Sequence, residues 1–178
     1  MRKIFIIIIM LSFFNNASAN YLKLASDFKF KSIDGDVLNL NDYKNKILVV
    51  VNVASRCGFT NQYEDLQKVW EKYKERNIII IGVPTNNFRQ EPGTNSEIKD
   101  FCKTNFNINF PMTEKINVIG PNAHPFYKWA RENYGKSAIP KWNFHKIIIG
   151  KDGKVAETFS SITKPTSKRF INYIESLI

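Results

Sequence analysis

A cysteine stands where the sequence changes from an apolar run into a helical pattern. Residues 47–53, Ile-Leu-Val-Val-Val-Asn-Val, are almost entirely apolar, and Cys57 follows shortly after them. The segment beyond Cys57 is amphipathic with helical spacing, so Cys57 is predicted to lie just ahead of a helix N-terminus. The partial positive charge there favours a thiolate over a thiol, and Arg56 can add to it. This is where a nucleophilic cysteine would be built.

Cys57 also has a simpler interpretation, as a small buried hydrophobic residue. A core cysteine would more naturally lie inside Leu48–Val53 than on the turn that follows. Two known redox motifs do not fit this turn. A Cys-x-x-Cys motif would need cysteine in place of Thr60, and a Pro-x-x-x-Thr-x-x-Cys motif would need proline at Val50 and threonine at Ala54.

The second cysteine, Cys102, leaves open a static disulfide with Cys57, a common arrangement in exported proteins. Two sulfurs are too few for a structural zinc site. The two histidines, His124 and His145, stand at no spacing typical of metal ligands. We therefore predict no metal site.

The chain of 178 residues carries a formal net charge of +10, which could indicate a nucleic-acid or membrane-surface partner. Its lysines are scattered among acidic residues and asparagines, without a basic tract or a basic stripe interleaved with aromatics. This pattern favours a solvated basic surface. We expect neither nucleic-acid binding nor stable insertion into a membrane.

The first nineteen residues resemble a secretory signal peptide. Arg2 and Lys3 form a positive n-region, residues 4–14 are apolar, and Ala17-Ser18-Ala19 is a small-x-small cleavage site. The apolar segment is too short for a membrane span, which needs about 20 residues. We predict an exported protein, periplasmic or secreted, in which residues 20–178 form one domain.

The elements around Cys57 predict one α/β domain. Two short strands flanking Asp34-Gly35 predict an N-terminal hairpin. Strand 47–53, a helix capped by Thr60 or Asn61 with Glu64, and strand 77–84 form a βαβ unit with parallel strands. The remaining predicted elements are helices over 94–105, 121–134 and 165–178, an extended segment over 107–112, and a hairpin of strands 142–149 and 154–159. This order fits a thioredoxin-like architecture, with a central mixed sheet flanked by helices.

Four separated motifs in this sequence resemble the glutathione peroxidase family in order and spacing. They are Asn52-Val-Ala-Ser-Arg-Cys-Gly-Phe-Thr60, Phe88-Arg-Gln-Glu-Pro-Gly-Thr94, Phe110-Pro-Met112 and Trp142-Asn-Phe144. The resemblance covers essentially all of residues 20–178. It implies a cysteine-type peroxidase that reduces hydrogen peroxide and organic or lipid hydroperoxides, without a bound cofactor.

The resemblance places the catalytic group of the family at Cys57, Gln90, Trp142 and Asn143. In such a group a thiolate attacks the peroxide and becomes a sulfenic acid, while the amides and the indole N–H donate hydrogen bonds. The family commonly spaces its loop as Phe-x-x-Gln-Glu, one residue longer than Phe88-Arg-Gln-Glu91, so Asn87 is an alternative donor.

Cys102 resembles the resolving cysteine of thioredoxin-dependent members, which implies a Cys57–Cys102 disulfide reset by a thioredoxin-like dithiol protein. The chain between Tyr134 and Trp142 lacks the longer insertion of tetrameric, glutathione-using members, so a monomer is expected. Two alternatives stay open. One is a glutathione-dependent peroxidase in which Cys102 is a bystander, and the other is a redox relay that passes oxidation to a partner protein.

Overall fold

The computed structural model describes residues 21–178, so the predicted signal peptide lies outside the described residues. A four-stranded mixed sheet in the order β4-β3-β5-β6 forms the centre, and β1 and β2 form a separate two-stranded sheet. The strands are β1 (Lys29–Lys31), β2 (Val37–Asn39), β3 (Ile47–Val53), β4 (Ile78–Pro84), β5 (Lys146–Ile149) and β6 (Val155–Phe159). The helices are α1 (Gln62–Tyr73), α2 (Asn95–Phe106), α3 (Pro125–Tyr134) and α4 (Lys168–Ser176), with short 3-10 helices at Ala25–Asp27, Leu40–Tyr43, Lys74–Arg76 and Lys136–Ala138.

The predicted βαβ unit is confirmed. Strand β3 runs parallel to β4, with Ile47 opposite Ile78 and Val53 opposite Pro84. Helix α1 connects the two strands. On its other side β3 pairs antiparallel with β5, which in turn pairs antiparallel with β6. Strand β3 is therefore a central strand, and its carboxyl end leads directly into the turn that holds Cys57.

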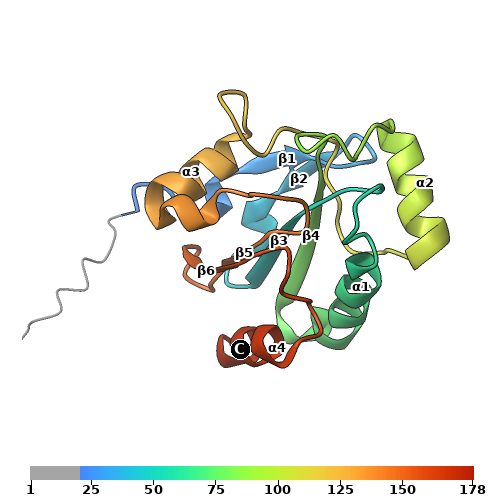
Figure 1. Cartoon of the computed structure of the whole chain (residues 1–178). Helices are drawn as coiled ribbons and strands as arrows, with labels where there is room; N and C mark the ends of the chain where they lie inside the picture. Colours follow the sequence, from blue (N-terminus) through green and yellow to red (C-terminus); the bar gives the residue numbers. More distant parts are fainter. Residues whose placement is uncertain (1–20) are drawn as a thin grey trace, which may run out of the picture.

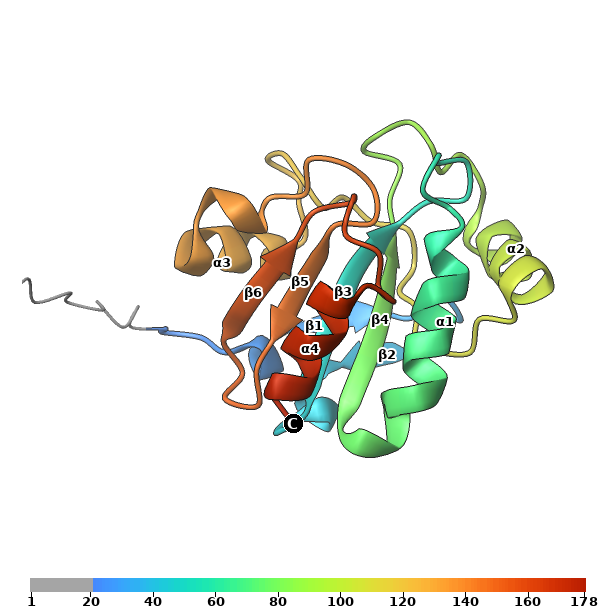
Figure 2. The ribbon, with the colours of Figure 1, turned by 60° about the horizontal axis from the view of Figure 1, so that its bottom comes forward.

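The sheet separates two apolar cores, which explains why β3 is apolar at almost every position. Alternate residues of a strand point to opposite faces. Ile47, Val49, Val51 and Val53 belong to the core beneath α1 and α4, whereas Leu48 and Val50 belong to the core beneath the hairpin and α3. Figure 1 shows the overall arrangement, and Figure 2 shows α1 and α4 in front of the sheet with the hairpin behind it.

Two predicted helix starts are wrong. Helix α3 begins at Pro125, not Pro121, because the His124 ring accepts a hydrogen bond from the Phe126 N–H and caps the helix there. Helix α4 begins at Lys168, where the Ser167 hydroxyl caps it. The extended segment 107–112 forms only one bridge, between Met112 and Gly82, and no strand. Within residues 21–178, no helix combines the length and apolar character needed to cross a membrane.

The largest departure concerns the segment 142–145, predicted as the start of a strand. Strand β5 begins only at Lys146. The reason is Phe144, whose φ of 64° lies in the left-handed region, where a bulky residue is unusual. This conformation interrupts the extended backbone, so Trp142 and Asn143 lie on a turn.

Candidate active site

The turn that carries Cys57 is held together by Thr60. The Thr60 hydroxyl accepts a hydrogen bond from the Cys57 N–H at 3.0 Å and donates one to the Ala54 carbonyl at 3.0 Å. The backbone N–H of Phe59 points at the Cys57 sulfur, 3.4 Å away. An N–H donor on the sulfur stabilises negative charge there. The thiol group of Cys57 is nearly buried, with 8% of the residue exposed.

The predicted capping of the helix after Cys57 is wrong. Asn61 occupies the N-cap position, but it has helical dihedral angles and its side chain makes no capping bond. The Thr60 hydroxyl is already engaged by the Cys57 turn. The first amides of α1 are satisfied instead by backbone bonds from Gln62 to Phe59 and from Tyr63 to Thr60. The cysteine turn therefore continues into the helix through backbone bonds alone.

The loop after β4 lies directly against this turn. The Arg56 N–H donates to the Gln90 carbonyl at 3.0 Å. The carboxylate of Glu91 accepts hydrogen bonds from the Ser55 N–H at 2.8 Å and from the Ser55 hydroxyl at 2.9 Å. These bonds fasten two successive residues before Cys57 to two successive residues of the loop.

The Trp142–Asn143 turn is fastened to the end of β3 by Asn52. The Asn52 amide donates to the Trp142 carbonyl at 3.1 Å, and the Asn52 carbonyl accepts from the Phe144 N–H at 2.6 Å. The Asn52 N–H also donates to the His145 carbonyl at 3.3 Å. Asn52 is the one polar residue in the buried segment 47–53, and this was the signal from which its role could have been found.

Two predicted site residues meet directly. The Asn143 amide donates to the Gln90 side-chain oxygen at 2.8 Å, although the residues stand 53 positions apart in sequence. This bond uses the oxygen of Gln90 and leaves its amide hydrogens for another acceptor. Asn143 is fully buried, and its own side-chain oxygen has no hydrogen-bond partner within residues 21–178. Since Gln90 is joined through its carbonyl to Arg56, the pair lies next to the Cys57 turn.

Trp142 lies at the exposed rim of this site. It is 41% exposed, and its ring stands 5.5 Å from the ring of Phe88, measured between centroids. Asn87, the alternative donor, is engaged elsewhere. Its side-chain oxygen accepts from the Val118 N–H at 2.7 Å, and its amide donates to Asn117 at 3.0 Å. Asn87 therefore anchors the 117–119 segment.

A buried lysine braces the first turn of α1. Lys146 is fully buried, and its ammonium group donates to the Gln62 side-chain oxygen at 2.6 Å and to the Thr163 carbonyl at 2.7 Å. The Gln62 amide in turn donates to the Ser161 carbonyl at 2.6 Å. Burial lowers the pKa of Lys146 to about 7. This network could not be predicted from the sequence, because a lysine at the start of an apolar strand is usually exposed.

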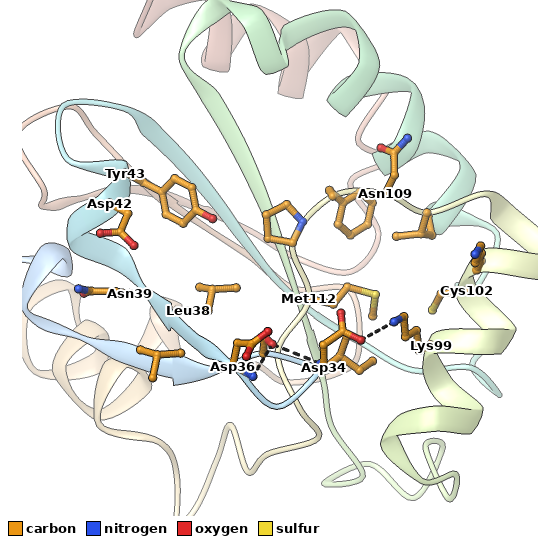
Figure 3. A pocket seen from close by; sticks show the side chains of 17 residues that line it. Asp34, Asp36, Leu38, Asn39, Asp42, Tyr43, Lys99, Cys102, Asn109 and Met112 are labelled. Carbon is orange, nitrogen blue, oxygen red and sulfur yellow. Dashed lines mark hydrogen bonds and ion pairs between the residues drawn. The ribbon is translucent and has the colours of Figure 1, made fainter.

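Cys102 lies in a different setting, on the inward face of α2. It is 1% exposed, and burial raises the pKa of its thiol to about 12, an effect that the nearby Tyr63 hydroxyl opposes and the charge of Glu91 reinforces. Cys102 lines a cavity of about 490 Å³ between the hairpin and α2. Figure 3 shows Cys102 and other residues that line it. Lys99 of α2 is paired with Asp34 of the hairpin at this cavity. Both cysteines are free.

No group of three or more His, Cys, Asp or Glu side chains among residues 21–178 is arranged to hold a metal ion. The site instead gathers one thiol, two carboxamides and an indole. These groups can generate a sulfur nucleophile and stabilise charge on an oxygen that it displaces.

A family model described as glutathione peroxidase matches residues 25–131. This chain belongs to the glutathione peroxidase family. The matched range includes Cys57 and Gln90, whereas Trp142 and Asn143 lie beyond it. Family membership identifies the chain as a thiol peroxidase, an oxidoreductase that reduces hydroperoxides.

Curated relatives agree with this assignment. The chain is 42% identical over 147 residues to the hydroperoxy fatty acid reductase of Synechocystis, covering 78% of this chain and 87% of that protein. It is 43% identical over 143 residues to a glutathione peroxidase of Lactococcus lactis, covering 78% and 90%. It is 41% identical over 155 residues to a glutathione peroxidase-like peroxiredoxin of Schizosaccharomyces pombe, covering 85% and 97%.

Solved structures support the fold. The crystal structure of Trgpx in its apo form matches with a TM-score of 0.67 and 35% identity, covering 86% of this chain and 97% of that one. A thiol:disulfide interchange protein of the thioredoxin family from Chlorobium tepidum matches with a TM-score of 0.62 and 19% identity, covering 84% of this chain and 90% of that one. The predicted thioredoxin-like fold is thus confirmed.

Proposed function

We propose that Cys57 is the peroxidatic nucleophile of this peroxidase and that Gln90, Trp142 and Asn143 are its hydrogen-bond donors. The single observation that carries this proposal is the 2.8 Å bond from Asn143 to Gln90, with Gln90 also bonded to the Cys57 turn. The Cys57 thiolate attacks one peroxide oxygen, the O–O bond breaks, and the departing oxygen takes up a proton. The products are a Cys57 sulfenic acid and water or an alcohol.

The indole N–H of Trp142 makes no hydrogen bond within residues 21–178, and the amide hydrogens of Gln90 are similarly free. N–H donors that have no other partner can donate hydrogen bonds to the departing oxygen as negative charge develops on it. We propose hydrogen peroxide and organic or lipid hydroperoxides as substrates. The name of the Synechocystis relative, a hydroperoxy fatty acid reductase, supports the second class.

The regenerating reductant is proposed to be a thioredoxin-like dithiol protein. Cys102 condenses with the Cys57 sulfenic acid, releasing water and forming a disulfide, which the dithiol protein then reduces. Relatives named glutathione peroxidase-like peroxiredoxins support a protein reductant. Two alternatives compete with this proposal. In one, glutathione is the reductant and Cys102 is a bystander; in the other, the oxidation of Cys57 is passed to a partner protein.

We further propose that the enzyme acts outside the cytoplasm as a monomer. The features that support export are Arg2 and Lys3, the apolar residues 4–14 and the Ala17-Ser-Ala19 cleavage motif. Amino-terminal sequencing of the exported protein tests this point, and we expect a new N-terminus at Asn20.

The decisive assay compares two reductant systems on the same protein. Peroxide consumption is followed through NADPH oxidation, once with thioredoxin and thioredoxin reductase and once with glutathione and glutathione reductase. We expect sustained turnover with thioredoxin and little with glutathione. The reverse result would make glutathione the reductant. If neither reductant system sustained turnover and peroxide consumption stopped after one stoichiometric burst, mixed disulfides with other proteins would favour the relay.

A further inference from the structure

Glu91 places a buried carboxylate against the turn that carries the nucleophile. The residue is 1% exposed, and one of its oxygens accepts both the Ser55 N–H and the Ser55 hydroxyl, at 2.8 and 2.9 Å. Ser55 stands two positions before Cys57. The Glu91 N–H is itself fixed by the Asn86 side chain at 3.0 Å. The backbone of Glu91 is thus anchored within its own loop, and its carboxylate holds Ser55 in turn.

We propose that Glu91 is a positioning residue for Cys57. Through Ser55, its ionised carboxylate fixes the turn so that the sulfur lies where the Gln90 and Asn143 amides can assist the displaced oxygen. This inference rests on the proposed role of Cys57. A hydrogen bond to a carboxylate is roughly twice as strong as one between neutral groups, so the ionised form holds Ser55 more firmly than the protonated form.

The negative charge of Glu91 does not stabilise the folded protein. No lysine or arginine within residues 21–178 lies within ion-pair distance of its carboxylate. Burial raises the pKa of Glu91, and the hydrogen bonds from Ser55 and the charges of Lys115 and Arg56 only partly oppose this. The other titratable groups facing it are Tyr63 on α1 and Cys102 on α2, and its charge raises the pKa of both.

The sign of the resulting pH dependence follows from linkage. A carboxyl group whose pKa is higher in the folded than in the unfolded protein binds more protons when folded. Its contribution to stability therefore falls as pH rises from the unfolded pKa, about 4.3, through the folded one. At neutral pH the ionised Glu91 costs folding free energy, so a neutral isostere should leave the fold equally stable or more stable.

Glu97 provides a matched control. Its carboxylate makes the same pair of bonds, accepting from the Thr94 N–H at 2.7 Å and the Thr94 hydroxyl at 2.9 Å. This pair caps the exposed start of α2 and not the Cys57 turn. The hydrogen bonds from Thr94 lower the pKa of Glu97. Its charge is therefore stabilising, the opposite of Glu91.

The test compares wild type with Glu91→Gln and Glu97→Gln. The second-order rate constant of Cys57 oxidation by hydrogen peroxide is measured in single turnover between pH 5 and 8. Each constant is divided by the thiolate fraction, taken from the pH dependence of Cys57 alkylation. Misplacement of a reacting group by about 1 Å can cost up to 10²-fold in rate. We expect Glu91→Gln to be about tenfold slower at pH 7.5 with an unchanged or higher urea midpoint.

Two further results are expected. The ratio of wild-type to Glu91→Gln rate constants should fall towards one as pH decreases, because wild-type Glu91 becomes protonated. Glu97→Gln should show the reverse combination, a lower urea midpoint with a rate constant within about twofold of wild type. Should Glu91→Gln fail to fold, Ser55→Ala, which removes only the hydroxyl bond, should show a smaller loss with the same pH trend.

A rate ratio of one at pH 7.5, or a ratio that does not change with pH, would overturn the proposal. So would a slower Glu91→Gln variant whose urea midpoint is lowered as in Glu97→Gln, since that would indicate a general structural role. These failures leave the proposed function intact. Only a Cys57→Ser variant that still reduces peroxide would refute the function itself.

Discussion

The two cysteines touch the same apolar core but have opposite chemical surroundings. Cys57 and Cys102 are both almost inaccessible, with 8% and 1% of each residue exposed. Cys57 lies on a turn ahead of α1, where the Phe59 N–H points at its sulfur. Cys102 lies within α2, where the backbone amides are used by the helix and burial raises its thiol pKa to about 12. Burial alone therefore does not distinguish the proposed nucleophile, Cys57, from the second thiol, Cys102.

What distinguishes them is the set of hydrogen-bond donors around each sulfur. The turn between β3 and α1 leaves the Phe59 N–H pointing at the Cys57 sulfur, whereas the interior of a helix leaves no backbone N–H free. The loop containing Gln90 and the turn containing Asn143 meet beside Cys57. The neighbours of Cys102 are the Tyr63 hydroxyl and the negative charge of Glu91, and the latter disfavours ionisation of the Cys102 thiol.

The strongest test of this comparison is Cys57→Ser. Serine keeps the shape of the turn but cannot supply a thiolate, so we expect peroxide reduction to be abolished while the urea unfolding midpoint stays close to wild type. The measurement is peroxide consumption with either reductant system. Retention of even a tenth of the activity would mean that Cys57 is not the nucleophile.

The next largest effect should come from the donors. Removing one preorganised donor typically costs about 2.7–4 kcal/mol, or 10²–10³ in rate, and donors that share a charge should fall at the low end. We expect Asn143→Ala and Gln90→Ala to lower the rate of Cys57 oxidation roughly a hundredfold. Trp142→Phe, which keeps the ring but removes its N–H, should behave similarly.

Asn87→Ala is the control for these variants. The Asn87 side chain binds the backbone N–H groups of Val118 and Ile119, so its loss should lower the unfolding midpoint and leave the oxidation rate close to wild type. If Gln90→Ala left the rate of Cys57 oxidation unchanged while Asn87→Ala lowered it strongly, the donor role would belong to Asn87.

The sequence predicted those parts of the molecule that repeat a simple pattern. The apolar runs of β3 and β4, the Asp34-Gly35 hairpin and a helix that opens at Thr94 all appear as expected. These features depend on local propensity and on burial of alternate residues, and both can be read from neighbouring positions.

The remaining features depend on contacts between distant segments. Trp142–His145 continues into an apolar strand in sequence, yet Phe144 adopts a φ of 64° because Asn52 binds the backbone on both sides of it. Glu91 stood within a recognised motif, but its bond to Ser55 spans 36 positions. No periodic pattern encodes such pairs, although the lone polar residue in a buried strand, Asn52, was a usable signal.

Cys102→Ser should have a selective effect. If Cys102 only resolves the sulfenic acid, the first oxidation of Cys57 should proceed at the wild-type rate, while repeated turnover with thioredoxin should stop. Stopped-flow measurement of the first turnover and a coupled assay of later ones separate the two steps. Sustained thioredoxin turnover in Cys102→Ser would make Cys102 a bystander, and a slower first turnover would give it a role in the nucleophile's environment.

The smallest effect, and the most specific, is expected in the backbone of α2. A disulfide requires Cα atoms within about 7 Å, and Cys102 is held inside a helix in the reduced protein. Helix α2 is suited to local opening, because only Ile98 and Cys102 of its 12 residues are buried, whereas α1 buries six of its 12. Elements with few buried side chains open at lower free energy than the rest of the fold.

We therefore expect one equivalent of peroxide to form a Cys57–Cys102 disulfide, detected by peptide mass spectrometry, and to speed amide hydrogen exchange over 101–105. Exchange in α1 around Leu66 and Val69 should stay unchanged and serves as the internal control. Thioredoxin should restore the slow exchange, since a catalytic disulfide must be easily reduced. A disulfide without faster exchange would show that the two sulfurs meet with α2 intact. Cys57 found as sulfinic acid with Cys102 still free would exclude the two-cysteine cycle, because the resolving step would then be slower than further oxidation by peroxide.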